Sequence, residues 1–420
     1  MNSADIIRKQ IQKAANKDPE YKVFGAQKHK YQLNPVTTIE KIRQFEQKYS
    51  LKLPEEYVFF LTQVGNGGAG PYYGLYSLEE VEKYNMDYQQ EPEVEALIDV
   101  SLSREKWNKA VCEMEDSDEK YDEILRRIAA GILVIGTQGC TYDNLLMCRG
   151  SESGKMVYID WNLEEDAPPF LTGMSFLDWY EGYFKEIAEG NQVTSYGYRM
   201  LGTESELWKA YARTEEVQEK RKILLSFYRF GKLSRKNMHF LSKLEGDSLD
   251  SLRVELLMKH HISLGMKAFE QLLYKTDPAE AIQCARRMPE EYKEKYYSRM
   301  LELLYNNESV DKEKILFFLN DCPCKQASDL AAYAMDEESR DEKSRKTTVY
   351  IMGNCEDAET YIEQFIILMR GDSYWLAHTA LQAVIRRNLD SPELRETFHW
   401  MKIKYENDSV MQNNLSHAKL

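Results

Sequence analysis

The sequence predicts an α+β N-terminal domain, with an antiparallel-rich sheet and flanking helices, followed by an all-α helical-repeat domain. Short β-rich apolar runs alternate with turn signals between residues 132 and 161. Helix-start patterns and amphipathic segments surround those runs. Beyond residue 203 nearly every segment has helical periodicity. We therefore predict domains at residues 1–195 and 203–420, with a link around residues 190–202.

Three helices are predicted first. Apolar residues recur on one face within residues 1–20. Thr37 and Glu40 match a capping box, in which a hydroxyl accepts a backbone N–H and a carboxylate reaches back. Pro54 is tolerated in a first helical turn and opens the third helix, whose apolar face begins at Tyr57.

Glycines end that third helix and turn the chain back. Asn66, Gly67 and Gly68 follow the helix, and an aromatic, strand-like run comes next at residues 72–76. A phosphate cradle would need a helix to begin after such glycines. A helix ends before them instead, so we interpret this stretch as a turn in which glycine supplies a positive φ.

The predicted sheet follows a second capping box, Ser77 with Glu80. Residues 89–123 indicate an exposed acidic insertion with partial helix, since so many carboxylates cannot be buried unpaired. Strands and one hairpin loop are then expected at residues 132–135, 144–148, 150–154 (the loop) and 156–159. Ser175 opens a closing helix whose aromatic residues can cover one sheet face.

A set of packing and turn residues runs through about residues 30–190: Leu53, Pro54, Tyr57, Asn66, Gly67, Gly68, Gly74, Gly136 and Trp179. In this order they resemble the SUKH superfamily, which includes fungal cell-wall-assembly regulators and many bacterial immunity proteins. The resemblance implies structural roles for these residues and a domain that binds another protein. Cys140 stands where a small or Gly-rich turn residue is expected, so the sequence departs from the pattern there.

The second half of the sequence is predicted to form consecutive helices. Thr203 and Glu206 match a capping box, and Pro392 occupies a first helical turn. Asp372 and Asp408 both precede helices and lie 36 residues apart (408 − 372), near the period of two-helix solenoid repeats. The region is weakly similar to HEAT-like repeats, whose concave surface usually holds another macromolecule.

Composition limits the class of partner. The 420 residues carry a formal charge of −14, with a pI near 5.2, so a nucleic-acid partner is not expected and a basic protein suits better. No apolar run approaches the length of a membrane span, and no signal peptide is expected. Seven scattered cysteines favour a reducing cytoplasm.

No catalytic or cofactor motif stands out. P-loop, GxGxxG, HExxH and GxSxG patterns are missing from the sequence. Cys322 and Cys324 lack the two-residue spacer of a redox pair and have no second ligand pair. His260 and His261 are adjacent on a helix and point about 100° apart. We predict no cofactor, no metal and no catalytic residue.

Acidic clusters with nearby aromatic residues are the candidate partner-binding residues. An acidic surface would attract a basic partner, and aromatic side chains would anchor it. The acidic candidates are Glu91, Glu93, Glu95, Glu113, Glu115, Asp116, Asp118, Asp143, Asp160, Glu164, Glu165 and Asp166; the aromatic candidates are Tyr72, Tyr73, Tyr88 and Trp107.

These observations support three functional hypotheses. The resemblance implies a non-enzymatic immunity protein that neutralises a cognate bacterial toxin, such as a nuclease or deaminase, by covering its active site. The alternative is an adaptor or scaffold in signalling or cell-wall regulation. The third is an enzyme with a cleft near Asp143 and Asp160.

Overall fold

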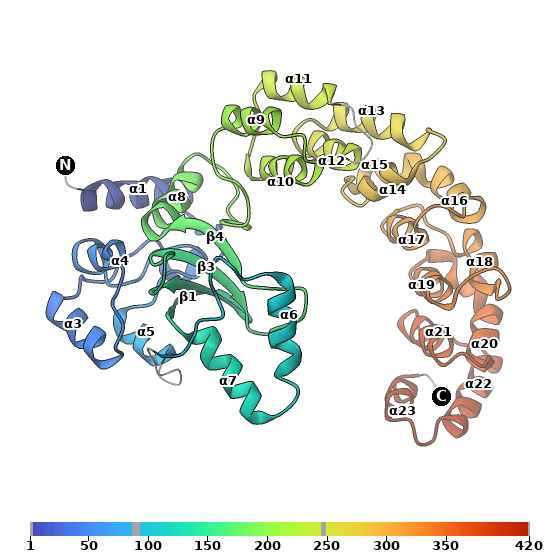
Figure 1. Cartoon of the computed structure of the whole chain (residues 1–420). Helices are drawn as coiled ribbons and strands as arrows, with labels where there is room; N and C mark the ends of the chain where they lie inside the picture. The colour runs from blue at the N-terminus through green and yellow to red at the C-terminus, as the bar shows by residue number, and fades with distance from the viewer. Residues whose placement is uncertain (1–2, 86–92, 245–248, 419–420) are drawn as a thin grey trace. The chain divides into compact units, whose positions relative to one another are not determined.

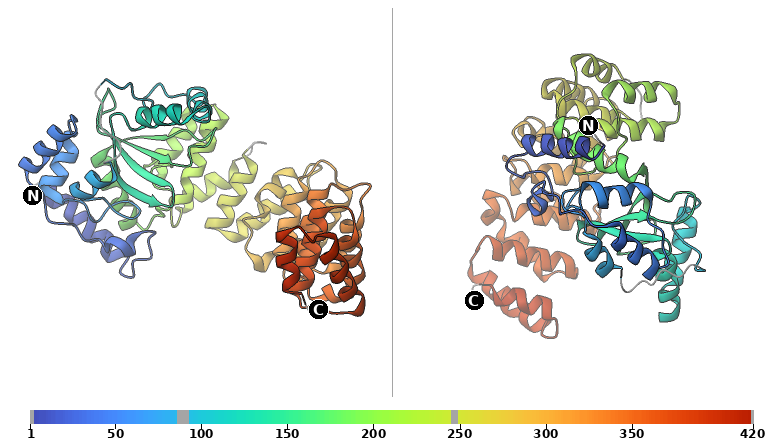
Figure 2. Two further views of the ribbon diagram at one scale, coloured as in Figure 1. Left: turned by 90° about the horizontal axis from the view of Figure 1, so that it is seen from below. Right: turned by 90° about the vertical axis from the view of Figure 1, so that its left-hand side faces the viewer.

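A computed structural model describes residues 3–85, 93–244 and 249–418. The chain divides into two compact units, Met1–Leu233 and Ser234–Leu420 (Figures 1 and 2). The first unit carries the sheet and its helices together with the first helices after residue 203. The narrower expectation, that the α+β domain itself ends near residue 195, stays a prediction.

A four-stranded antiparallel sheet in the order β1-β2-β3-β4 forms the centre of the first unit. Its strands are β1 (Ile132–Gly139), β2 (Tyr142–Met147), β3 (Lys155–Asp160) and β4 (Phe170–Ser175). Leu145 pairs with Val134 on one side and Val157 on the other, so apolar residues line one face in register. The predicted antiparallel sheet is confirmed.

The strand-like run expected at residues 72–76 is not a continuous strand. Leu75 forms isolated bridges with Gly68 and Gly136, and no longer strand is assigned there. Gly136 allows this approach, because a Cβ at that position would lie 2.6 Å from the carbonyl oxygen of Gly74.

Helices surround the sheet in the first unit. They are α1 (Ser3–Lys17), α2 (Ala26–His29), α3 (Ile39–Lys48), α4 (Glu55–Phe59), the π-helical turn η1 (Phe60–Val64), α5 (Leu78–Tyr84), α6 (Arg104–Glu113), α7 (Asp118–Ala129), α8 (Phe176–Ala188), α9 (Glu204–Arg213), α10 (Val217–Ser226) and η2 (Phe227–Arg229). α8 packs on α1, β3 and β4, while α6 and α7 pack together beside β1 (Figure 1).

The hydrophobic core of the first unit is built partly from residues that carry the resemblance. Tyr57 and Phe60 are fully buried, with ring centroids 5.1 and 5.4 Å from that of Phe176. η1 follows α4 directly and closes with a bond from the Gly65 amide to the Phe60 carbonyl at 2.9 Å. Gly67 and Gly68 then take positive φ values of 79° and 94°, as the turn interpretation predicts.

Capping chemistry explains where several helices begin. Capping boxes are present at Ser77 with Glu80 and at Thr203 with Glu206, as predicted. At the earlier helix the N-cap is Thr38 rather than Thr37: its hydroxyl accepts from the Lys41 amide, while Thr37 is buried. The two threonines are adjacent, so pattern alone cannot choose between them.

The segment predicted as a link is packed against the sheet. The carbonyl of Tyr196 accepts hydrogen bonds from the hydroxyls of Tyr72 at 2.6 Å and Tyr158 at 3.1 Å. Val193 and Tyr196 are buried, and Gly197 comes close to the Tyr158 hydroxyl with a φ of 82°. Val193 and Tyr196 of this segment therefore belong to the first unit's core.

The second unit is all-α, which confirms the predicted fold class. Its elements are α11 (Arg235–Lys243), α12 (Asp250–His260), α13 (Ile262–Leu273), α14 (Ala279–Ala285), α15 (Glu290–Lys293), η3 (Glu294–Tyr296), α16 (Tyr297–Asn306), α17 (Lys312–Asn320), η4 (Ala327–Asp329), α18 (Ala331–Met335), α19 (Glu342–Met352), η5 (Glu356–Tyr361), α20 (Ile362–Arg370), α21 (Tyr374–Arg386), α22 (Pro392–Lys404) and α23 (Ser409–Ser416).

These helices stack in two layers. α14, α17, α19, α21 and α23 contact one another in turn along one layer, and α18, α20 and α22 along the other (Figure 1). Asn354, just after α19, hydrogen-bonds to Asn320 at the end of α17 and to Arg386 at the end of α21. Stacked helix pairs suit a solenoid, although the HEAT-like period itself stays a prediction. Within the described ranges no helix is long and apolar enough to cross a membrane.

Candidate functional site: an acidic surface beside exposed aromatic side chains

Two of the acidic clusters meet where α6 packs on the β3–β4 connection. The indole Nε1 of Trp107 donates to the Glu164 carbonyl at 3.0 Å. At the next residue of α6, Asn108 Nδ2 donates to Asp166 Oδ1 at 3.0 Å, and the Asp166 amide donates to Asn108 Oδ1 at 2.9 Å. α6 therefore fixes the position of the β3–β4 connection.

This contact gathers carboxylates around the end of α6. The Cys112 thiol donates to Glu165 Oε1 at 3.4 Å, and this bond, with the charges of Glu165, Glu115 and Asp116, raises the pKa of the thiol. We call Glu115, Asp116, Glu164, Glu165 and Asp166 the acidic surface; all five are exposed. The candidates Glu115 and Asp116 thus lie in one region with Glu164, Glu165 and Asp166.

Most of this charge is not neutralised locally. Asp166 lies 3.8 Å from the Arg104 guanidinium, and Glu113 lies 3.8 Å from the Lys109 ammonium. Across the described parts of the chain, the other four members of the acidic surface form no ion pair. An exposed group of unpaired carboxylates attracts a cationic partner and raises its association rate.

Exposed aromatic side chains lie beside the acidic surface. Tyr142, Phe170 and Tyr198 are 42, 39 and 37 % exposed, and we call them the aromatic cluster. The ring centroids of Phe170 and Tyr198 are 5.0 Å apart. A hydrogen bond to Asp160, together with the charges of Asp160 and Glu164, raises the pKa of Tyr142, so this ring lies within electrostatic reach of the acidic surface.

The aromatic cluster is not among the residues predicted from sequence. Tyr142 pairs with Asp160 and Phe170 pairs with Tyr158, so strand register decides that these rings share a face. Tyr198 joins them through Tyr158, whose ring centroid is 4.8 Å from its own. Alternation along β2 could have indicated that Tyr142 and the buried Leu145 point to opposite faces, but the cross-strand partners depend on register.

Two predicted aromatic anchors are corrected, because they are buried. Tyr72 is 2 % exposed and donates its hydroxyl to Tyr196, and Trp107 is fully buried under the β3–β4 connection. Neither ring has surface to offer a partner. Tyr73 is half-buried, with its ring centroid 5.2 Å from that of Phe24, and Tyr88 lies outside the described residues.

The remaining acidic candidates lie elsewhere. Glu95 lines a cleft with Glu152 of the β2–β3 hairpin, at the opposite strand ends from the β3–β4 connection. Its neighbour Glu93 is exposed, Glu91 lies outside the described residues, and Asp118 is exposed at the first position of α7. The third acidic cluster is therefore separate from the acidic surface.

Asp143 and Asp160 serve local structure and do not face each other. Asp143 accepts from Trp161 Nε1 at 2.8 Å, and burial raises the pKa of its carboxyl. Asp160 accepts from the Thr141 hydroxyl at 2.7 Å and the Asn162 amide at 3.0 Å; these bonds outweigh burial and lower its pKa. Because Asp160 pairs with Tyr142, the two aspartates lie on opposite faces of the sheet. This arrangement gives no support to an acid and base pair.

The residues behind the resemblance hold the fold. Leu53, Tyr57 and Trp179 are buried, and Gly74 has a φ of 92° where its backbone meets Gly68. Pro54 is the N-cap of α4. Cys140 adopts a left-handed φ of 52° after Gly139, so it takes the turn conformation that glycine usually supplies. Across the described ranges, no group of three or more His, Cys, Asp or Glu residues is arranged to hold a metal ion.

Comparison with known proteins finds one family model that matches part of the first unit. Residues 37–182 match the model of the SMI1 / KNR4 family (SUKH-1). The match runs from the start of α3 into α8, so it includes the sheet, the acidic surface and two members of the aromatic cluster, and it confirms the resemblance to the SUKH superfamily. A search of curated proteins finds no match to the chain.

Proposed function

We propose that this protein is a cytoplasmic, non-enzymatic immunity protein whose acidic surface binds a basic toxin domain and covers its active site. The SUKH-1 match at residues 37–182 supports a role of this class. The seven cysteines are all free thiols, which suits a reducing compartment. A nuclease or nucleic-acid deaminase is the expected toxin, because such enzymes carry basic grooves that contact phosphates.

The observation that carries the proposal is the meeting of unpaired carboxylates with exposed rings. The acidic surface supplies long-range attraction, and Glu115, Asp116, Glu164 and Glu165 have no neutralising partner among the described residues. Charge at an interface rim contributes little affinity by itself, so buried aromatic anchors are needed as well. Tyr142, Phe170 and Tyr198 replace the anchors predicted from sequence.

The contacts under this surface suit a preformed interface. Trp107 and Asn108 hold the β3–β4 connection through its backbone and the Asp166 side chain. A carboxylate that is already positioned loses little conformational entropy on binding. The charged groups therefore remain available while their backbone is fixed.

The experiment is affinity capture by the tagged full-length chain, followed by a growth assay with each captured protein. The test variant combines Glu115→Gln, Glu164→Gln and Glu165→Gln, which removes three charges and breaks no ion pair. The matched control combines Glu337→Gln, Glu338→Gln and Glu363→Gln, three exposed carboxylates of the second unit. Association of the partner should slow about tenfold in the test variant only.

One dominant partner that arrests growth when expressed alone, and is neutralised by the wild-type chain and the control but less well by the test variant, supports the proposal. Several salt-sensitive regulatory partners, none of them toxic, would instead favour the adaptor or scaffold role. Equal neutralisation by the test and control variants would contradict the acidic surface as the binding site.

A further inference from the structure

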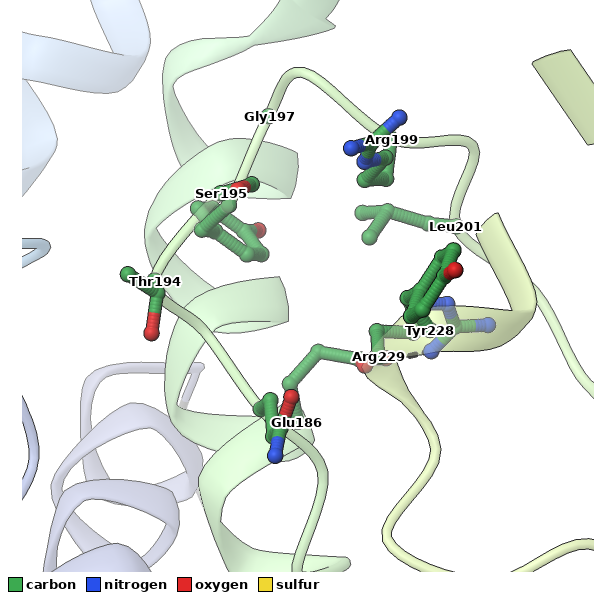
Figure 3. A pocket seen from close by; sticks show the side chains of 10 residues that line it. Glu186, Thr194, Ser195, Gly197, Arg199, Leu201, Tyr228 and Arg229 are labelled. Atoms are coloured by element: carbon green, nitrogen blue, oxygen red, sulfur yellow. Dashed lines mark hydrogen bonds and ion pairs between the residues drawn. The ribbon is translucent and has the colours of Figure 1, made fainter. Parts of the chain in front are cut away.

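A small cavity in the first unit lies between α8, the segment 192–201 and η2 (Figure 3). Its volume is about 70 Å³. One water needs roughly 10–15 Å³ of such volume, so the cavity has room for about five non-hydrogen atoms. Exposed Thr194 and Ser195 line it, and in Figure 3 Arg199 lies toward one end and the Glu186–Arg229 pair toward the other.

Arg229 brings a buried charge with unused donors to this cavity. Its side chain is 5 % exposed, and Nη1 donates to the carboxylate of Glu186, which also accepts from Asn191 Nδ2 at 3.1 Å. Nε and Nη2 have no hydrogen-bond partner in the described structure. Buried donors nearly always have partners in folded proteins, so an acceptor beyond the described residues is expected near this guanidinium.

Arg199 supplies a second guanidinium. It lines the cavity half-buried and makes no ion pair or hydrogen bond with any described residue. The Ser195 hydroxyl and the Tyr228 side chain line the same space. With Arg229 and Glu186, the lining carries one net positive charge in a chain whose formal charge is −14.

We propose that this cavity binds a tetrahedral oxyanion of phosphate size, either free or as the terminal phosphate of a small molecule. A phosphate presents several acceptor oxygens, and guanidinium groups match them with forked, charge-assisted hydrogen bonds. A carboxylate is planar and offers only two oxygens, so it gives the two guanidinium groups fewer acceptors than a phosphate does. This inference is independent of the immunity function proposed above.

The ligand would also join separate elements of the first unit. Glu186 belongs to α8, Arg199 to the segment packed against the sheet, and Arg229 to η2. An anion that contacts both arginines would stabilise these elements together, so thermal stability as well as binding reports on the site.

The test is calorimetric titration of the full-length chain with inorganic phosphate, glycerol 3-phosphate or acetate at constant ionic strength, with thermal unfolding measured in parallel. Arg199→Gln is the decisive variant, because Arg199 has no ion pair with any described residue to lose. Arg221→Gln, at an exposed position of α10, is the matched control. We expect saturable phosphate binding that weakens about tenfold or more in Arg199→Gln and is unchanged in Arg221→Gln.

The two phosphate ligands distinguish the sources: binding of inorganic phosphate alone assigns the free anion, and tighter binding of glycerol 3-phosphate assigns a phosphorylated small molecule. No saturable binding by the wild-type chain, equal binding by Arg199→Gln, or a response to acetate alone would overturn the proposal. If Arg199→Gln does not fold, Arg199→Lys is used, which keeps the charge and should still weaken binding because the fork is lost.

Discussion

Asn66 joins the turn after η1 to the start of α5 through its side chain: Oδ1 accepts from the Leu78 amide at 2.8 Å, and Nδ2 donates to Glu79 Oε2 at 2.9 Å. The side chain is 8 % exposed. Asn66 therefore satisfies a backbone donor in the first turn of a helix that would otherwise be unpaired. This explains why an amide stands at the family position before the two glycines.

Asn66→Ala should lower the free energy of unfolding by about 2 kcal/mol, because it leaves the buried Leu78 amide without an acceptor. Chemical denaturation of the full chain measures this. Asn34→Ala is the control: it removes one bond, to the Asn66 carbonyl, at a partly exposed site and should cost clearly less. Equal losses would show that the helix start does not depend on Asn66.

Tyr158→Phe should destabilise the first unit more than Tyr72→Phe. The Tyr158 hydroxyl accepts from Trp179 Nε1 at 2.6 Å and donates to the Tyr196 carbonyl, so its loss leaves a buried indole donor unpaired. We expect a cost of about 2 kcal/mol. After Tyr72→Phe the Tyr196 carbonyl still accepts from Tyr158, so the expected cost is below about 1 kcal/mol.

Denaturation gives these energies, and limited proteolysis within residues 190–202 gives a second measure, because both hydroxyls hold this segment. The prediction is wrong if Tyr72→Phe costs as much as Tyr158→Phe, or if neither variant speeds cleavage there.

The local parts of the fold could be predicted from sequence, and the parts that depend on register could not. The capping boxes at Ser77 and Thr203 and the antiparallel strands follow from short-range patterns, and the structure confirms them. The burial of Trp107 depends on a contact with Glu164, 57 residues away, which no local pattern reports. The acidic residues of this surface could therefore be named from sequence, but the burial of Tyr72 and Trp107 could not.

The segment 190–202 shows the same limit. Its glycines and polar residues are typical of a linker. Its docking depends on Tyr72 and Tyr158, which are 124 and 38 residues away from Tyr196. The cavity with Arg199 and Arg229 follows from that docking, so it too could not be found from sequence.

The buried side chain of His29 should make the free energy of unfolding depend on pH. The side chain is 8 % exposed, and burial lowers its pKa from 6.5 to about 4, despite the Tyr72 carbonyl and the Asp18 carboxylate, which favour the protonated ring. Between those two pH values the unfolded chain binds a proton that the folded chain does not. The stability contributed by neutral His29 is therefore complete above pH 6.5 and is lost progressively as the pH falls to 4, by at most about 3 kcal/mol.

The measurement compares denaturation of the wild type and His29→Gln from pH 7.5 to 4. Other groups titrate equally in both proteins, so the difference between their unfolding free energies isolates His29. That difference should stay constant above pH 6.5 and shift against the wild type below it. Parallel curves across the whole range would contradict a buried neutral imidazole.

Asn108 should keep the Asp166 part of the acidic surface in place while contributing little to the free energy of unfolding. It makes two hydrogen bonds to Asp166, one to the carboxylate and one from the amide, at a partly exposed site where water can replace them. Asn108→Ala should therefore cost less than about 1 kcal/mol in denaturation. Amide hydrogen exchange at Asp166 should nevertheless speed up severalfold, because its amide loses the acceptor that protects it.

Lys109→Ala is the matched control. It removes the neighbouring side chain of α6, whose only ion pair among the described residues is the exposed 3.8 Å contact with Glu113, and it leaves both bonds to Asp166 in place. Exchange at Asp166 should not change in this variant. If the acidic surface binds a partner in its observed geometry, Asn108→Ala should also raise the partner's dissociation rate, since the carboxylates must then be ordered on binding. Unchanged exchange at Asp166 in Asn108→Ala would show that the other contacts of α6 hold the β3–β4 connection without Asn108.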